Sequence, residues 1–395
     1  MFRLLLENFK IIVGNLSNLL KRILIKRPIY NFFKTNYSDK ILISYVVKPF
    51  RNGQDLTHTH NREVVEIAKV FHELKFEVDI VDYTYDGWLD FDKYDIILGF
   101  GEPLVNSFYN ATRDIIRIYF GAGMHVCTQN HNTLNRIEEV YKRKGKWILE
   151  SGRIVDKTWS AQTTLVDAMI LLGNDIVKES YNKYYAKPIY LIPTSIYKVL
   201  NYEEIISSKD FADAKKHYLW FGSTGLIHKG LDLLLEVFKD YTDLHLHICG
   251  PIDDEKKFNL EYHNELYKTP NIHTHGFVLL DSPLFKELLQ KCAFVIYPSC
   301  SEGGSPSVLN VCGNGGLIPI VSYESTITVE DFGFYLKSIN SREIMNAIEL
   351  TQQMSESELF EKSSLCGRTI TSMNSIENFR EELYKAVKVI IDSHR

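Results

Sequence analysis

Short apolar runs alternate with amphipathic helical segments along this chain of 395 residues, and they do so in two blocks. The first block extends from a strand at Ile41–Val47 to one at Tyr190–Pro193, and the second from His217–Phe221 to Leu317–Val321. Such alternation predicts parallel sheets, because parallel strands need crossover helices. We therefore expect an α/β protein with two Rossmann-like parallel-sheet domains. Its ligands should bind beyond the carboxyl ends of the strands, in a central cleft between the domains.

The remaining elements follow from the same pattern. The other predicted strands are Val78–Val81, Asp95–Gly99, Ile116–Phe120, Ala168–Leu172, Leu244–Cys249, Ile272–His275 and Phe294–Tyr297. The predicted helices include residues 61–75, 229–240, 255–267, 282–291, 305–313 and 375–391. Residues 196–215 lack apolar periodicity and are expected to be a linker.

Composition excludes several classes of protein. The chain is 45% hydrophobic and 24% charged, as is usual for a soluble globular protein, and its net charge of -5 gives no basic field for nucleic acid. Its six cysteines are scattered and form no CxxC pair. We expect buried thiols in a reducing cytosol rather than a disulfide framework or a zinc site.

The N-terminal segment, residues 1–37, predicts a basic amphipathic helix. Its apolar stripe consists of Leu5, Phe9, Ile12, Leu16, Leu19 and Ile23. Such a helix is able to lie on an anionic membrane surface, and equally to pack on its own domain or on a partner chain. Polar residues interrupt it too often for a signal peptide, and no apolar run is long enough to span a membrane. We expect a cytoplasmic protein, with a peripheral position on the inner face of the membrane as one alternative.

The segment SEGGSPSVLN at residues 301–310 follows the apolar run Phe294–Pro298. Ser305 stands at the N-cap of a predicted helix and Pro306 at its first position. The N–H groups and dipole of such a helix start favour an anion. The adjacent carboxylate of Glu302 favours hydroxyls and repels phosphate. Together these features predict a phosphorylated sugar as the ligand.

A second glycine-containing loop, Phe221–Gly230, opens the second block. Small residues allow a ligand to approach the backbone closely, and a lysine at the mouth of the loop, Lys229, supplies a point charge for phosphate oxygens. The loop alone is a weak signal, because it is not a Walker motif and solvated lysines at helix starts are common.

In combination, these motifs resemble the C-terminal half of GT-B glycosyltransferases, in the large retaining class called family 4. The motifs that carry the resemblance are Phe221–Gly230, His247–Pro251, Asn271–Val278, Pro298–Gly303 and Gly315–Val321. The resemblance is specific over residues 217–325 and extends elsewhere only to the fold.

The resemblance implies a UDP- or GDP-sugar as donor, bound by residues 201–372. It implies an acceptor domain at residues 38–200 and a C-terminal helix, residues 373–395, that crosses back to that domain. Lys229 matches the lysine that neutralises the diphosphate, and Glu302 matches the first acid of the E-x7-E motif, which contacts the sugar hydroxyls. The other implied donor-binding residues are Gly222, Ser223, Thr224, Gly250, Phe277, Val278, Gly303, Gly304, Ser305 and Asn310. Neither a metal nor a cofactor is expected.

Two positions depart from the family pattern. Asn310 stands where the motif has its second glutamate, which accepts hydrogen bonds from the ribose; an amide still accepts but carries no charge. The basic residue that often precedes Lys-Gly is also absent, and Ser223, Thr224 and His228 occupy that loop.

Histidines in the first block supply further candidates. His125 follows the strand Ile116–Phe120, where the family often has a histidine near the transferred bond; the alternative is a loop histidine bonded to backbone. On the acceptor side, the candidates are Asn52, Gly53, His58 and His60. In the second block, His245/His247 and His273/His275 are expected to be structural, with one of each pair facing the core.

The resulting expectation is a retaining glycosyltransferase of the hexosyltransferase type. It would extend a saccharide or lipid-linked saccharide in cell-surface polysaccharide or lipopolysaccharide synthesis. The alternatives are a catalytically inactive GT-B scaffold or binding subunit, which Asn310 would favour, and a GT-B enzyme that hydrolyses or epimerises the donor.

Overall fold

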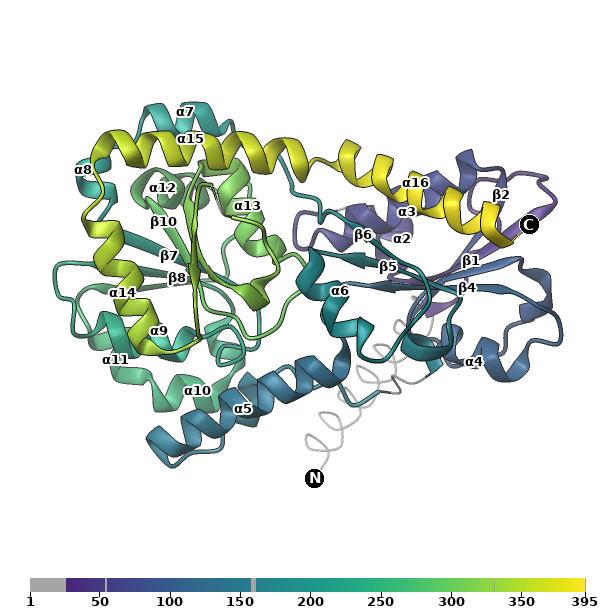
Figure 1. Cartoon of the computed structure of the whole chain (residues 1–395), viewed down its shortest axis with the longest axis horizontal. Coiled ribbons are helices and arrows are strands. Elements are labelled where there is room, and N and C mark those ends of the chain that lie inside the picture. The colour runs from purple at the N-terminus through teal and green to yellow at the C-terminus, as the bar shows by residue number, and fades with distance from the viewer. Residues whose placement is uncertain (1–25, 54, 158–160, 330, 395) are drawn as a thin grey trace, which may run out of the picture. The chain divides into compact units, whose positions relative to one another are not determined.

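The computed structural model describes residues 26–53, 55–157, 161–329 and 331–394 (Figure 1). One compact unit contains the described residues up to Phe120, those between Ser160 and Met169, and those from Ile390 onward. The second contains the described residues of Gly121–Trp159 and Ile170–Val389. The amphipathic stripe predicted at the N-terminus lies outside the described residues, so its helix and its membrane contact stay predictions.

The first sheet has six parallel strands in the order β2-β1-β3-β4-β5-β6. Its strands are β1 (Asp39–Tyr45), β2 (Phe76–Asp82), β3 (Ile96–Gly99), β4 (Ile116–Gly121), β5 (Ala168–Leu172) and β6 (Ile189–Ile192). The helices of this block are α2 (Lys48–Asn52), α3 (His60–Glu73), α4 (Glu102–Asn110), α5 (Val126–Lys144) and α6 (Asp175–Asn182). Strands β3 and β5 are buried throughout, as expected of parallel strands covered on both faces.

The second sheet has the order β12-β11-β10-β7-β8-β9 and is also parallel. Its strands are β7 (His217–Phe221), β8 (His245–Cys249), β9 (Ile272–Gly276), β10 (Phe294–Tyr297), β11 (Ile318–Ser322) and β12 (Phe334–Leu336). Its helices are α9 (Leu231–Phe238), α10 (Lys256–Glu261), α11 (His263–Lys268), α12 (Pro283–Lys291) and α13 (Pro306–Gly315). The predicted α/β class with two parallel sheets is thereby confirmed.

The predicted linker is more ordered than its composition suggested. It contains two short helices, α7 (Tyr202–Ser207) and α8 (Phe211–Ala214). Two asparagines of α13 bind the backbone N-terminal to α7: Asn310 accepts the N–H of Tyr197 at 2.8 Å, and Asn314 accepts that of Val199 at 2.8 Å. Tertiary hydrogen bonds therefore hold a segment that lacks apolar periodicity.

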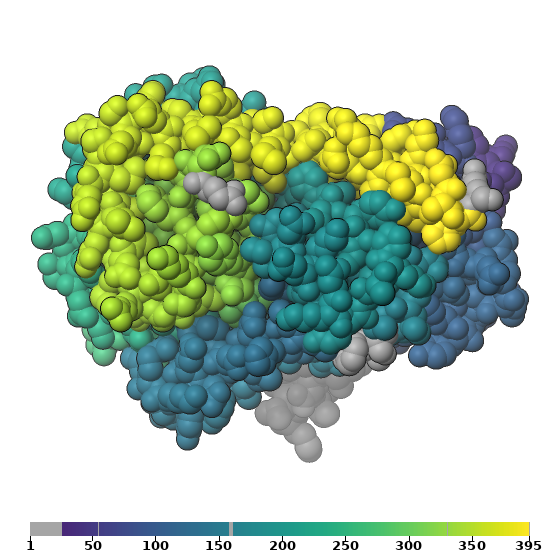
Figure 2. Space-filling model, in the orientation of Figure 1, coloured from purple at the N-terminus to yellow at the C-terminus, as the bar shows by residue number. Residues whose placement is uncertain are grey.

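Besides a short 3-10 turn at Tyr323–Ser325, three elements between β11 and the C-terminal helix were not predicted. They are β12, α14 (Ser341–Gln352) and α15 (Glu356–Met373), followed by the predicted last helix as α16 (Ile376–His394). Strand β12 has only three residues, which is too short for a periodic signal. The start of α15 did carry a signal, a capping box between Ser355 and Glu358. Figure 2 shows the surface of the second unit to which α14 and α15 contribute.

The expectation of buried thiols holds for all but one of the six cysteines. None of the six is in a disulfide; five are buried, and Cys127 is half-buried. Over the described part of the chain, no helix is long and apolar enough to cross a membrane.

Five histidines form a ladder across β7, β8 and β9. They are His217, His245, His247, His273 and His275. The links are side-chain hydrogen bonds of 2.9 Å between His217 and His247, and of 3.1 Å between His247 and His275. The expectation that paired histidines face opposite sides of the sheet was wrong, because residues two apart on a strand point to the same face. No three His, Cys, Asp or Glu residues of the described chain are placed to hold a metal ion.

Helix α5 is joined to α9 through a buried carboxylate. Asp232, whose side chain is fully buried, accepts two hydrogen bonds from Arg136 at 2.8 and 2.9 Å. Arg143 donates a third at 2.6 Å. Two arginines about two turns apart on α5 thus neutralise one acid on α9, which fixes the position of α5 along the second sheet's helical layer.

We expect Asp232→Ala to lower the free energy of unfolding of the second unit by about 3–5 kcal/mol, because the substitution leaves a buried guanidinium without its counter-charge. Urea denaturation measures the change. Glu139→Gln is the matched control: Glu139 pairs with the same Arg136 but is 46% exposed. Its effect should stay below about 1 kcal/mol. Equal losses in the two variants would contradict the role assigned to Asp232.

The histidine ladder predicts destabilisation by acid. Burial lowers the pKa of His217 to about 4 and that of His247 to about 2. Both rings therefore stay neutral in the folded protein while the unfolded chain takes up protons below about pH 6.5. The contribution of each ring to the free energy of unfolding is therefore fully present above that pH. It falls as the pH drops, by up to about 2 kcal/mol per such ring at pH 5. Thermal melting of His247→Gln should show a smaller loss between neutral pH and pH 5 than the wild type; an unchanged pH dependence would refute the assignment.

Candidate functional site

The turn after β10 keeps its predicted position but not all of its predicted contacts. Ser305 occupies the N-cap of α13 with φ 35°, and Pro306 is the first helical residue. The predicted N-cap position of Ser305 is confirmed, but its side chain does not cap the helix, because its hydroxyl donates to the carbonyl of Ser325 at 2.7 Å. The Gly304 N–H, expected to face a phosphate, donates to Thr326 Oγ1 at 2.6 Å. Gly303 packs so closely on the backbone of Ala122 that a Cβ would not fit.

Lys229 and Glu302, predicted from separate motifs, meet in the structure. Lys229 Nζ lies 3.0 Å from Glu302 Oε1, and the side chains are only 2% and 8% exposed. Burial lowers the pKa of Lys229 to about 8, although the carboxylate opposes the shift. Burial would raise the pKa of Glu302, but the charges of Lys229 and Arg153 outweigh it and hold that pKa at about 2. Both groups are therefore ionised near neutral pH.

Glu302 accepts further bonds that fix its orientation. The hydroxyls of Tyr297 and Ser299 donate to Oε1 at 3.0 and 2.9 Å. The second oxygen, Oε2, lies 3.5 Å from a guanidinium nitrogen of Arg153. One oxygen is thus saturated by buried donors, while the other faces a half-exposed cation. Arg153 was not among the predicted site residues, because nothing in its local sequence marks it.

Helix α5 supports this turn. His228 bonds through Nδ1 to Thr133 Oγ1 at 2.7 Å and through Nε2 to the carbonyl of Ser301 at 2.6 Å. Because a carbonyl only accepts, Nε2 carries the proton and Nδ1 accepts from the threonine. Asn132 donates to the carbonyl of Cys300 at 2.8 Å. His228 of the loop and Cys300 of the turn are therefore held directly by one helix that the sequence did not connect with them, and Ser301 is held through His228.

The glycine loop is shaped by a buried acid. Glu255 accepts hydrogen bonds from the backbone N–H groups of Gly225 and Leu226, the latter at 3.1 Å. The predicted donor residues Ser223 and Thr224 are exposed at the tip. Glu255 was also missed, because it lies in a different segment of the sequence from the loop that it holds.

The other glycines of the predicted site bring strand ends together. The Gly222 N–H donates to the carbonyl of Cys249 at 2.9 Å, and the Gly250 N–H donates to that of Gly276 at 2.8 Å. A Cβ on Gly250 would lie 2.8 Å from the Gly222 carbonyl oxygen, so both positions need a small residue.

The residues expected to line the base follow β9. Gly276 turns the chain with φ +72°, and Phe277 then presents a ring that is 58% exposed, whereas Val278 is only 6% exposed. An exposed aromatic ring at the carboxyl end of a parallel strand is placed where ligands of such sheets bind. The sequence-based role of Phe277 remains a prediction.

Asn310 is engaged by the protein itself. Its Oδ1 accepts from the backbone of Tyr197, and its Nδ2 donates to the carbonyl of Pro306 at 2.8 Å. The residue is 4% exposed. An amide makes both of these hydrogen bonds, whereas a carboxylate, which cannot donate, would make only the first. A ribose contact would have to be added to them.

His125 lies at the start of α5 and is fully buried. Its Nδ1 accepts the N–H of Cys127 at 3.2 Å, so the side chain caps the helix. Its ring stacks on that of Tyr184 with centroids 4.2 Å apart. Burial lowers the pKa of His125 to about 4, which keeps the ring neutral. This is the backbone-bonded arrangement that the sequence left open as the alternative to a catalytic role.

The acceptor-side candidates lie in the first unit, between β1 and the first turn of α3. Asn52 ends α2 and is exposed, as is Gly53 with φ 82°. His58 is exposed, and its Nδ1 accepts the N–H of His60 at 3.2 Å. The ring of His60 bonds to the hydroxyl of Tyr45. The structure thus brings the two histidines together beside the end of β1.

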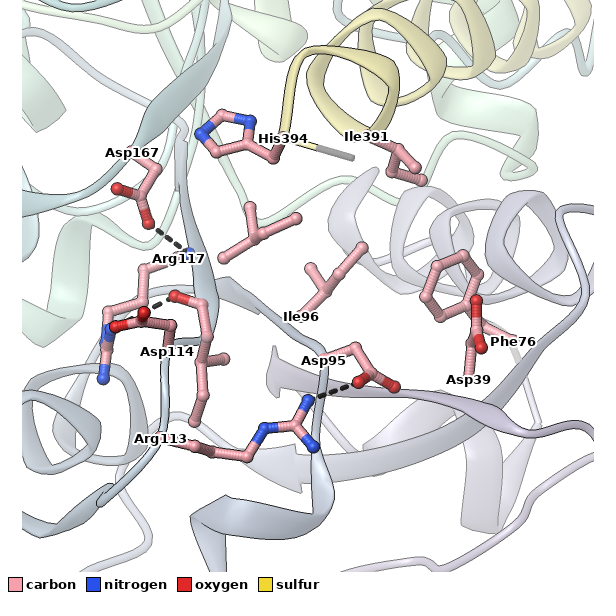
Figure 3. Close-up of a pocket in the computed structure, with 12 residues that line it drawn as sticks. Asp39, Phe76, Asp95, Ile96, Arg113, Asp114, Arg117, Asp167, Ile391 and His394 are labelled. Carbon is pink, nitrogen blue, oxygen red and sulfur yellow. Dashed lines mark hydrogen bonds and ion pairs between the residues drawn. The ribbon is translucent and has the colours of Figure 1, made fainter.

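The first unit also contains a cavity of about 840 Å³ that contributes nothing to the predicted site (Figure 3). It lies where strands begin, opposite to the ligand-binding ends. Its acids serve the backbone: Asp95 accepts the N–H of Lys40 at 2.8 Å, and Asp167 accepts that of Arg117 at 2.9 Å. These carboxylates accept hydrogen bonds from backbone N–H groups at the amino ends of the strands.

The family model described as "Glycosyl transferases group 1" matches residues 203–331. No curated protein matches the chain by sequence. Among solved structures, HepE from Anabaena in complex with UDP and glucose is 10% identical, with a TM-score of 0.55 over 89% of this chain and 100% of that chain. An α,α-trehalose 6-phosphate synthase from Burkholderia multivorans is 10% identical, with a TM-score of 0.59 over 91% and 100% of the two chains.

At such low identity, the solved structures show a shared fold, which is GT-B. The family match covers the glycine loop, Lys229 and the Glu302 turn, the same segment that carried the resemblance in the sequence. The chain therefore has the GT-B fold, and its residues 203–331 are similar to group 1 glycosyltransferases.

Proposed function

We propose that the protein is a retaining hexosyltransferase that uses a nucleotide-diphosphate sugar. The observation that carries the proposal is the buried Lys229–Glu302 pair, in which a cation and an acid lie 3.0 Å apart at the carboxyl ends of β7 and β10. The two groups match the two halves of such a donor, an anionic diphosphate and a hydroxyl-rich sugar. A UDP-sugar is the first donor to test, because solved structures of the same fold include HepE in complex with UDP-glucose.

The reaction breaks the bond between sugar C1 and the diphosphate oxygen. Negative charge develops on the leaving phosphate and positive charge on the sugar ring. Lys229 stabilises the leaving group, and its effect is large because the site is buried. Glu302 accepts hydrogen bonds from sugar hydroxyls and so orients the ring. The acceptor hydroxyl attacks the same face that the diphosphate leaves, and a leaving-phosphate oxygen takes its proton.

His125 takes a positioning role in this scheme. Its buried ring caps α5, and α5 holds the Glu302 turn through Thr133 and Asn132. The acceptor is a saccharide or a lipid-linked saccharide of a cell-surface polysaccharide or lipopolysaccharide. The residues assigned to it are Asn52, Gly53, His58 and His60.

Lys229→Ala and Glu302→Gln should each lower kcat/KM for sugar transfer by at least about 100-fold, or about 3 kcal/mol, because each removes charge from a preorganised site. The assay is release of nucleotide from a panel of UDP- and GDP-sugars with a mixed glycan acceptor, and NMR of the product gives the anomeric configuration. Lys239→Ala is the control, since Lys239 is an exposed lysine at the other end of α9.

Full activity in the Lys229 and Glu302 variants would disprove the assigned site, and an inverted product would disprove retention. A wild-type protein that binds UDP or GDP in calorimetry without transferring would favour the binding-subunit alternative.

Nucleotide-diphosphate affinity should fall as the pH rises above about 8. Burial lowers the pKa of Lys229 to about 8, so that raising the pH through this value removes the proton that the diphosphate needs. The dissociation constant should then rise by up to about tenfold per pH unit. Calorimetry near pH 7 and pH 9 measures the change. Lys229→Arg keeps its charge over this range and should lose the pH dependence; if it does not, another group is responsible.

A further inference from the structure

The glycine loop before Lys229 contains no second cation. Residues 222–228 include neither lysine nor arginine. A diphosphate carries more than one negative charge, and Lys229 is already paired with Glu302. A site with only these two groups has no net charge. If the proposed function is right, a further cation must come from elsewhere in the chain.

Arg153 occupies the place where that cation is needed. It lies 3.5 Å from Oε2 of Glu302, on the opposite oxygen from Lys229. Its stem packs on the glycine loop, since a Cβ on Gly225 would lie 2.7 Å from Arg153 Cγ. The side chain is 44% exposed, whereas that of Lys229 is 2% exposed.

The backbone around Arg153 is anchored independently of its side chain. Its carbonyl accepts a hydrogen bond from Gln129 on α5 at 2.7 Å, and the carbonyl of Ser151 accepts the N–H of His228 at 3.1 Å. Lys257 also donates its N–H to the side chain of Glu150. The segment after α5 is therefore held against the glycine loop and the start of α10, and the guanidinium is the part left to bind a ligand.

The charge balance of the site distinguishes the Arg153–Glu302 pair from an ordinary surface ion pair. Lys229, Tyr297 and Ser299 already satisfy Oε1 of Glu302. Arg153 adds a positive charge beyond that needed to neutralise the carboxylate. A guanidinium presents a planar fork of donors that suits phosphate oxygens, and its partial exposure lets it reach a ligand without breaking a buried pair.

We propose that Arg153 is a donor-binding residue that supplies the second cation of the diphosphate subsite, in place of a basic residue in the loop before Lys229. The inference rests on the proposed function and adds to it a residue from a different part of the chain. Arg153 and Lys229 bind the diphosphate from two sides, and Glu302 between them is left to the sugar hydroxyls.

The test compares nucleotide with nucleoside. In the wild type and in Arg153→Gln, calorimetry gives the affinity for UDP and GDP, and ligand-observed NMR gives that for uridine and guanosine. We expect Arg153→Gln to weaken binding of the diphosphate about tenfold or more and to leave nucleoside binding unchanged, because only the diphosphate meets the cation. Arg153→Lys should recover part of the affinity. Arg342→Gln, at an exposed arginine on α14, should change neither.

Three outcomes overturn the inference. Unchanged diphosphate affinity in Arg153→Gln, with transfer by the wild type intact, refutes it and leaves the proposed function standing. Equal loss of nucleoside and diphosphate binding, together with a lower melting temperature, assigns Arg153 a structural role instead. A wild-type protein that binds neither UDP nor GDP refutes the proposed function and the inference with it.

Discussion

The carboxylate of Glu302 is the constraint around which the second unit is organised. A buried charge is costly unless it is paired and hydrogen-bonded, so its neighbours must come from wherever the fold is able to supply them. Lys229 comes from the loop after β7, Tyr297 and Ser299 come from the end of β10, and Arg153 follows α5. Three pieces of sequence that lie far apart in the chain meet at one buried acid that needs compensation.

Helix α5 turns that cluster into a rigid site. At one end it is capped by His125; along its length, Asn132 and Thr133 hold the Glu302 turn, and Arg136 binds the buried Asp232. The same helix therefore anchors itself to α9 and positions the Glu302 turn. A helix so placed links stability to function, since loosening its hold on α9 also loosens the turn.

Much of the fold was predictable because its signals are local. Apolar runs of the β10 type, fully buried in the sheet, predict strands by themselves, and the helix start at Pro306 is marked by its residue types. The histidines of the ladder were correctly predicted to lie on strands. Their faces were predicted wrongly, although the spacing of two residues already places both members of a pair on one face. Strand β12 was missed because three residues carry no period. The capping box between Ser355 and Glu358 is a local signal that would have predicted the start of α15.

The sequence by itself determined the α/β class and the two-block order, because each rests on residue types at short spacing. It also marked Lys229 and Glu302, in two separate motifs, as candidate donor-binding residues. Only the tertiary structure decided that these two groups touch, that the Ser305 hydroxyl turns to Ser325, that Asn310 holds Tyr197, and that Arg153 faces the Glu302 carboxylate. The physical reason is that compensation of a buried charge acts through space. The partners of a buried charge are the residues that the folded backbone places beside it. They cannot be identified from the residues that neighbour the charge in the sequence.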